Sequence, residues 1–129
     1  MPLKFFRIGL VLLSLVFINR TISADEIRHS FFIAGPTFTG IIDEDGREAW
    51  DSGKASARDG FVLPNGNVLI AWSDEVKEFT RDKQVVFRFA RSAEAKEIGT
   101  VERLENGRTL ITELGPKPRL LEKIGRAHV

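Results

Sequence analysis

Few residues of this sequence have the chemistry of a catalytic or metal-binding site. The chain contains no cysteine, which excludes a disulfide scaffold, a thiolate zinc site, an iron–sulfur cluster and a cysteine nucleophile. Its two histidines, His29 and His128, stand near opposite ends of the sequence. His29 precedes Ser30, and the two could serve nucleophilic catalysis, but no acidic residue is positioned beside them to orient the imidazole. We therefore expect no catalytic residue and no metal site in this segment.

Three further patterns could bind a ligand, and each has a simpler structural interpretation. Residues 43–46 (DEDG) contain a fragment of a calcium-binding loop but lack the remaining ligands and the closing glutamate, so we interpret them as an acidic hairpin turn. Trp50 and Trp72 could stack on a sugar or an aromatic ligand, but their places near strand ends favour packing between sheets. Residues 115–118 (GPKP) form a rigid loop and not a phosphate cradle, because no Gly-x-x-x-x-Gly-Lys follows.

Residues 1–24 predict a secretory signal peptide. They comprise two positive charges within the first seven residues, an 11-residue apolar run over 8–18 and a short polar stretch that ends in small residues at Ala24. The run is shorter than the ~20 residues of a membrane-spanning helix. Cleavage after Ala24 would start the mature chain at Asp25. We therefore predict an exported protein, periplasmic or extracellular, without membrane contact after signal removal; an uncleaved amino-terminal anchor is the alternative.

Length and charge restrict the class of protein further. The 129 residues suffice for one domain, and 43% hydrophobic with 29% charged residues is an ordinary foldable composition. The formal net charge of +1 includes three basic residues of the leader, which has no acid. Without residues 1–24 there are 16 basic and 18 acidic residues, a net charge of −2. This balance gives no electrostatic footprint for nucleic acid.

The residues after the leader predict short strands separated by turns. The dipeptides Asn65-Gly66 and Asn106-Gly107 are typical of two-residue type I′ turns, Asp45-Gly46 is a similar signal, and Arg81–Lys83 is a turn without glycine. Residues 92–97 have no apolar stripe at helical spacing and are predicted to form a loop with one turn. Ten strands rich in Val, Ile, Phe and Thr are expected, at Phe31–Ala34, Thr39–Asp43, Glu48–Asp51, Gly60–Leu63, Val68–Trp72, Val76–Thr80, Val85–Ala90, Ile98–Arg103, Thr109–Glu113 and Leu120–Glu122.

The strands belong to an internal repeat. Leu63–Ile70 recurs as Leu104–Ile111 at an offset of 41 residues, and Ile42–Trp50 aligns with Phe79–Phe87 at an offset of 37. A period near 40 residues with about four strands is typical of a β-propeller blade. One unit spans about residues 57–90, with half a unit on either side. We therefore predict an all-β, incomplete β-propeller of about two and a half four-stranded antiparallel blades over residues 25–123.

The repeat resembles a known family. The segment 63–69 (LPNGNVL), followed by 85–87 (VVF), and the pattern Asp43-x-x-Gly46-x-x-x-Trp50 are similar to the blades of secreted bacterial propellers of the pyrroloquinoline-quinone-repeat-like (quinoprotein/arylsulfotransferase-like) type. The resemblance covers about residues 29–122 and implies an architecture. No acidic residue here matches a quinoprotein calcium ligand or catalytic carboxylate, so the resemblance implies no cofactor for this segment.

These observations favour a non-catalytic function. We expect a ligand- or protein-binding scaffold module whose partner is unknown. The alternative is the amino-terminal part of a quinone-dependent dehydrogenase, with pyrroloquinoline quinone as cofactor, or of an arylsulfotransferase-like enzyme. Arg58 and Asp59 precede a strand expected to be innermost, at the mouth of a propeller channel, so we predict that they lie on the binding face. A salt-bridged or solvated loop pair is the alternative for these two residues. A small β-sandwich is a third option for the fold, which the repeat register disfavours.

The end of the sequence carries a separate expectation. A closed propeller has four to eight blades, so we expect this chain to be an amino-terminal fragment of a longer one. Residues 124–129 (IGRAHV) can be back-translated into the start of a sequencing adapter, and the repeat pattern stops at Glu122. We therefore expect a non-native tail over 124–129, with a genuine terminus as the alternative.

Overall fold

The computed structural model describes residues 28–124, which form ten strands in three antiparallel sheets and contain no helix. The all-β prediction is confirmed, and each expected strand is found within one residue of its predicted bounds. The predicted signal peptide and all of the expected tail except Ile124 lie outside the described residues. The strands are β1 (Phe31–Ala34), β2 (Thr39–Ile42), β3 (Glu48–Asp51), β4 (Asp59–Val62), β5 (Val68–Ala71), β6 (Glu75–Phe79), β7 (Val85–Ala90), β8 (Glu97–Arg103), β9 (Thr109–Leu114) and β10 (Arg119–Lys123).

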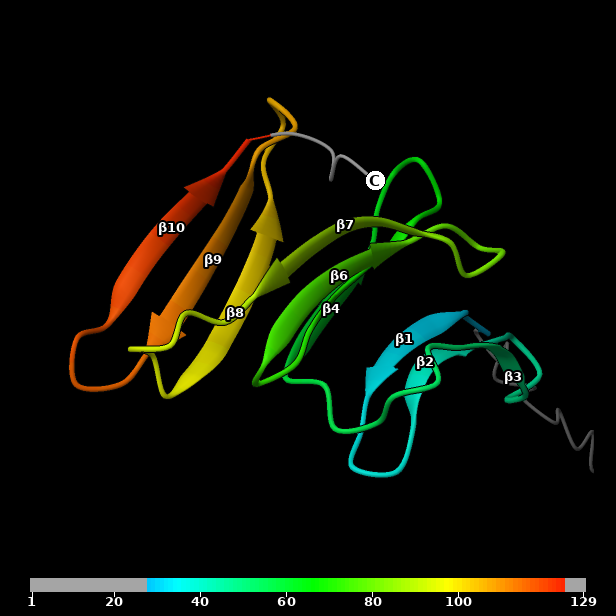
Figure 1. Cartoon of the computed structure of the whole chain (residues 1–129). Coiled ribbons are helices and arrows are strands. Elements are labelled where there is room, and N and C mark those ends of the chain that lie inside the picture. The colour runs from blue at the N-terminus through cyan, green and yellow to red at the C-terminus, as the bar shows by residue number, and fades with distance from the viewer. Residues whose placement is uncertain (1–27, 125–129) are drawn as a thin grey trace, which may run out of the picture.

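The three sheets follow one another along the chain. The first contains β1-β2-β3, the middle one β4-β5-β6-β7 and the third β8-β9-β10. In Figure 1 the middle sheet, drawn in green, lies between the cyan first sheet and the yellow-to-red third sheet. Within residues 28–124, no helix is long and apolar enough to cross a membrane.

The sequence repeat corresponds to a structural repeat. In the first sheet Gly40 pairs with Asp51 across β2 and β3, and 37 residues later Lys77 pairs with Arg88 across β6 and β7. Both strand pairs also shift register at the same point, after Ile41 and after Glu78. The offset of 41 likewise relates β4-β5 to β8-β9: Gly60↔Ile70 and Phe61↔Leu69 become Val101↔Ile111 and Glu102↔Leu110.

Four hairpins have the same three-residue turn. In each, the third turn residue has a positive φ, and its N–H donates to the carbonyl of the residue three positions earlier, which is a type I turn followed by a bulge. The interpretation of Asn65-Gly66 and Asn106-Gly107 as type I′ turns is wrong, because only the glycine of each dipeptide has a positive φ. The positive-φ residues are Gly46 (78°), Gly66 (84°), Lys83 (68°) and Gly107 (80°).

Two apolar cores hold the sheets together. Between the first and middle sheets, Ile41 and Trp50 pack with Val68, Ile70, Trp72 and Phe79. Between the middle and third sheets, residues of β5, β6 and β7 (Leu69, Ala71, Val76, Phe87) pack with Ile98, Val101 and Ile111. Because β5 faces a core on each side, all four of its residues are buried. A continuously apolar sequence, VLIA in β5, is typical of a strand that is covered on both faces.

Candidate functional site

Arg58 and Asp59 connect the middle sheet to the third sheet. The Arg58 guanidinium forms an ion pair with the Glu97 carboxylate at the start of β8. Asp59 accepts hydrogen bonds on both oxygens: Oδ1 from the N–H of Gly60 (2.9 Å) and Oδ2 from the N–H of Val101 (3.1 Å). Both side chains therefore have structural partners at the edge of β4. Their assignment to a binding face stays a prediction.

The amino-terminal candidates form hairpin contacts. Ser30 Oγ donates to the carbonyl of Ile42 (3.0 Å), while His29 is exposed. Asp43 Oδ1 accepts the N–H groups of Asp45 (2.9 Å) and Arg47 (2.8 Å), so this carboxylate organises the turn. The interpretation of residues 43–46 as an acidic hairpin turn is thus confirmed. Among the described residues, no group of three or more potential ligands could hold a metal ion.

The two tryptophans are packing residues, as the sequence suggested. Trp50 and Trp72 are both buried, and each meets Phe79 edge-on, with ring centroids 5.7 Å and 6.3 Å apart. Their indole N–H groups donate to backbone carbonyls, that of Trp50 to Arg81 (2.9 Å) and that of Trp72 to Lys54 (3.1 Å). Neither ring face is open to stack on a sugar.

A buried glutamate that sequence analysis missed occupies the position equivalent to Trp72 in the third sheet. Glu113 is fully buried, and its carboxylate accepts the N–H (2.7 Å) and the Oγ–H (2.9 Å) of Ser92. Desolvation alone would raise the pKa of Glu113, but these hydrogen bonds and the ion pair with Arg119 (2.5 Å) hold it below its usual value. Trp72 is therefore hydrogen-bonded to the connection between β3 and β4, and Glu113 is hydrogen-bonded to the connection between β7 and β8. The alternation Thr109-x-Ile111-x-Glu113 was the signal for this inward-facing position.

A second buried glutamate, Glu75, forms ion pairs with three basic side chains. Glu75 accepts from Lys54 (3.0 Å), Lys77 (2.8 Å) and Arg88 Nε (3.0 Å). Burial disfavours its charged form, but the hydrogen bonds from the two lysines lower the pKa of Glu75 to about 2. Lys54 also contacts Asp74 (2.7 Å), and the partly buried ammonium, although desolvated, has a raised pKa beside two carboxylates. This cluster fixes the connection before β4 onto β6.

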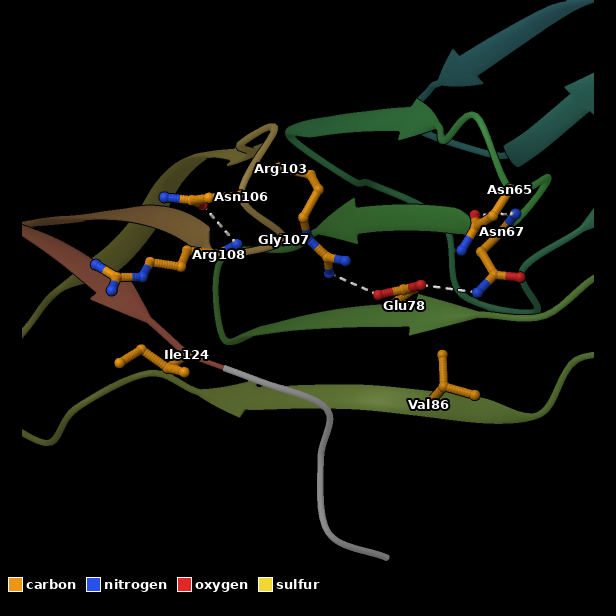
Figure 2. Close-up of a pocket in the computed structure, with 9 residues that line it drawn as sticks. All are labelled: Asn65, Asn67, Glu78, Val86, Arg103, Asn106, Gly107, Arg108 and Ile124. Carbon is orange, nitrogen blue, oxygen red and sulfur yellow. Dashed lines mark hydrogen bonds and ion pairs between the residues drawn. The ribbon is translucent and has the colours of Figure 1, made fainter.

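The third buried glutamate lies in a cleft between the middle and third sheets. Glu78 of β6 is 5% exposed, and its Oε1 accepts from the amide of Asn67 (2.7 Å) while its Oε2 accepts from the guanidinium of Arg103 (2.6 Å). Arg103 Nε in turn donates to Thr109 Oγ1 (3.0 Å). Figure 2 shows Glu78 held between Asn67 and Arg103. The sequence gives no local signal for this pair, because its members are 25 residues apart and in different sheets.

The cleft around Glu78 is the best candidate for a ligand-binding site. It has a volume of about 640 Å³. The tips of two equivalent hairpins, β4-β5 and β8-β9, form its walls, and amide and guanidinium side chains line it together with apolar surface (Figure 2). The amide, guanidinium and carboxylate groups among these residues can form hydrogen bonds with a polar ligand. Its lining residues are Asn65, Asn67, Glu78, Val86, Arg103, Asn106, Gly107, Arg108 and Ile124.

Comparison with known proteins indicates the fold alone. No protein-family model matches this chain, and no curated protein matches it. Among solved structures, the chain is similar to a crystal structure of a protein of unknown function from Bacteroides caccae, with a TM-score of 0.61 and 22% sequence identity. The match covers 74% of this chain and 37% of that protein, so the chain spans little more than a third of the matched protein's length.

Proposed function

We propose that this chain is part of an exported β-propeller whose repeated sheets act as a binding scaffold. The observation that carries the proposal is the equivalence of the sheets, whose hairpins have the same turns and the same pairing register at offsets of 37 and 41 residues, with an apolar core between each pair of neighbouring sheets. Repeats that pack only on their neighbours along the chain support a propeller or a related repeat array.

Binding, and not catalysis, is the activity that we propose for these repeats. The buried carboxylates Glu75, Glu78 and Glu113 are all held by cations or hydrogen bonds, as structural groups are. The cleft between the hairpin tips, and the edge at Arg58 and Asp59 toward the opposite ends of β4 and β8, each supply polar groups from two sheets. A ligand that contacts both sheets would gain affinity from a surface that the cores hold rigid.

Two measurements test this function. Fusion of residues 1–30 to a reporter that folds only outside the cytoplasm should give activity, and the amino-terminal sequence of the exported chain should begin at Asp25. For binding, soluble oligosaccharides and short peptides would be titrated into ¹⁵N-labelled chain. Perturbed amide signals at Asn65 and Asn106, lost in an Arg103→Met variant but not in Glu105→Gln, would support the cleft. A folded chain with no perturbation at the cleft or at Arg58 and Asp59 would contradict a binding scaffold.

A further inference from the structure

The far face of the third sheet carries apolar residues at positions that are buried in the middle sheet. Leu120 pairs with Thr112 in β9 just as Val76 pairs with Ala71 in β5, so Leu120 and Val76 occupy equivalent positions. Val76 is 0% exposed because the third sheet covers it, whereas Leu120 is 66% exposed. Leu114 on the same face is also exposed. An exposed apolar face of this kind is typical of an interaction surface.

The same face reproduces part of the Glu78 network. Glu122 pairs with Leu110 as Glu78 pairs with Leu69, so the two glutamates are equivalent. Arg108, which is equivalent to Asn67, donates to Glu122 Oε1 (3.0 Å), as Asn67 donates to Glu78. Glu78 also receives a guanidinium from the neighbouring sheet through Arg103 (2.6 Å).

The two positions that Glu78 and Arg103 occupy are matched in chemical type at both existing interfaces. Between the first and middle sheets the equivalent positions are Ile41 and Val62, both apolar, which line one shared pocket. Between the middle and third sheets they are Glu78 and Arg103, an anion and a cation. At the equivalent position the far face of the third sheet has Glu122, which Arg108 contacts within the same sheet (3.0 Å); by the equivalence with Glu78, the partner of Glu122 across the next interface is a cation.

We propose that the far face of the third sheet docks one further antiparallel sheet of the same repeat, whose first strand carries an arginine at the position of Arg103 to contact Glu122. The inference rests on the proposed propeller and adds the chemistry of its next interface. Leu110 and Leu120 supply the apolar centre of this interface, as Leu69 and Val76 do in the middle sheet. A sheet of this repeat would give Glu122, which Arg108 already contacts within the third sheet, the second, inter-sheet partner that Glu78 has in Arg103, whereas an unrelated apolar surface would bury the Glu122–Arg108 pair without that contact.

The test uses a chain that has no native cysteine. A Leu120→Cys substitution gives a single thiol on the docking face, which we expect to react with a maleimide almost as fast as a free thiol. A second copy of residues 80–123 is then inserted between Lys123 and Ile124, which supplies a fourth strand for the third sheet and a further sheet beyond it. Labelling at position 120 should then slow by at least about tenfold, because it would require local opening of the interface.

Charge variants of the inserted protein test the arginine. Glu122→Arg in the first copy should restore fast labelling at position 120, and Arg103→Glu in the inserted copy should slow it again in the same protein. Glu105→Arg is the matched control, because it makes the same charge change in an exposed hairpin turn, and it should leave labelling slow.

Each outcome decides the inference. Fast labelling in a folded inserted protein, judged by near-ultraviolet circular dichroism, would overturn it, and so would a Glu122→Arg variant that stays protected. Slow labelling in the original chain, together with a dimer in solution, would assign the face to a second copy instead. Export and cleft binding are measured separately, so the proposed function can survive or fail independently.

A second experiment needs no insertion. Ile41→Glu should destabilise the original chain, and Val62→Arg in the same protein should recover part of the lost stability, because an ion pair would replace an apolar pair at the same two positions. A double variant no more stable than Ile41→Glu alone would refute the pairing of these positions on which the inference depends.

Discussion

The ion pair between Glu78 and Arg103 gives the sharpest test of how the middle and third sheets are joined. An Arg103→Met substitution keeps most of the side-chain volume but leaves the Glu78 carboxylate, 5% exposed, without its cation. Breaking a buried ion pair costs about 3–5 kcal/mol. Because the Arg103 side chain is itself 22% exposed, we expect the lower end, about 3 kcal/mol of unfolding free energy. The double variant Glu78→Leu with Arg103→Met replaces the ion pair by two apolar side chains. It should lose only about 1 kcal/mol of unfolding free energy, mainly because the Asn67 amide loses its hydrogen-bond acceptor.

Urea unfolding followed by the fluorescence of Trp50 and Trp72, which lie in the other core, measures these differences. A loss of 3 kcal/mol lowers the urea midpoint by about 2 M when m is about 1.5 kcal/mol/M. Arg108→Met is the control, because Arg108 and Glu122 are both more than 40% exposed and their pair should contribute under about 1 kcal/mol. An Arg103→Met variant no less stable than Arg108→Met would refute the argument that Glu78 is desolvated.

Three further outcomes follow from individual side chains. The folded-state pKa of Glu75 is lowered to about 2, so the stability that its charge contributes is present above about pH 4.5 and is lost as the pH falls toward 2. In a plot of urea midpoint against pH, Glu75→Gln should therefore reduce the slope between about pH 4.5 and 2. An unchanged slope would contradict this assignment. Lys83 has φ 68°, so Lys83→Gly should stabilise by about 1 kcal/mol and raise Tm, whereas Gly107→Ala should lower it. Trp72→Phe removes the hydrogen bonds to the connection before β4, which should lower the unfolding free energy by about 1 kcal/mol. Backbone amides of residues 54–58 should then exchange hydrogen faster. Unaltered exchange would count against a role of Trp72 in holding this connection.

The strands, the repeat and the role of the tryptophans could be predicted because their causes are local. Alternating or continuous runs of β-branched and aromatic residues determine where strands form, and β5 shows this most clearly with Val68–Ala71 buried on both faces. The turns were located correctly but not their type. A type I′ turn needs two positive φ values, and Asn65 and Asn106 each keep a negative φ in a three-residue turn.

Local sequence patterns were sufficient to predict the ten strands, their period and the burial of Trp50 and Trp72. They could not predict which polar groups contact one another across the sheets: Arg103 with Glu78, the N–H of Val101 with Asp59, and Ser92 with Glu113. The two kinds of feature differ in the sequence separation over which their causes act. Strand propensity and alternation act over a few residues, whereas these contacts join residues 21 to 42 positions apart, whose approach depends on how one sheet stacks on the next.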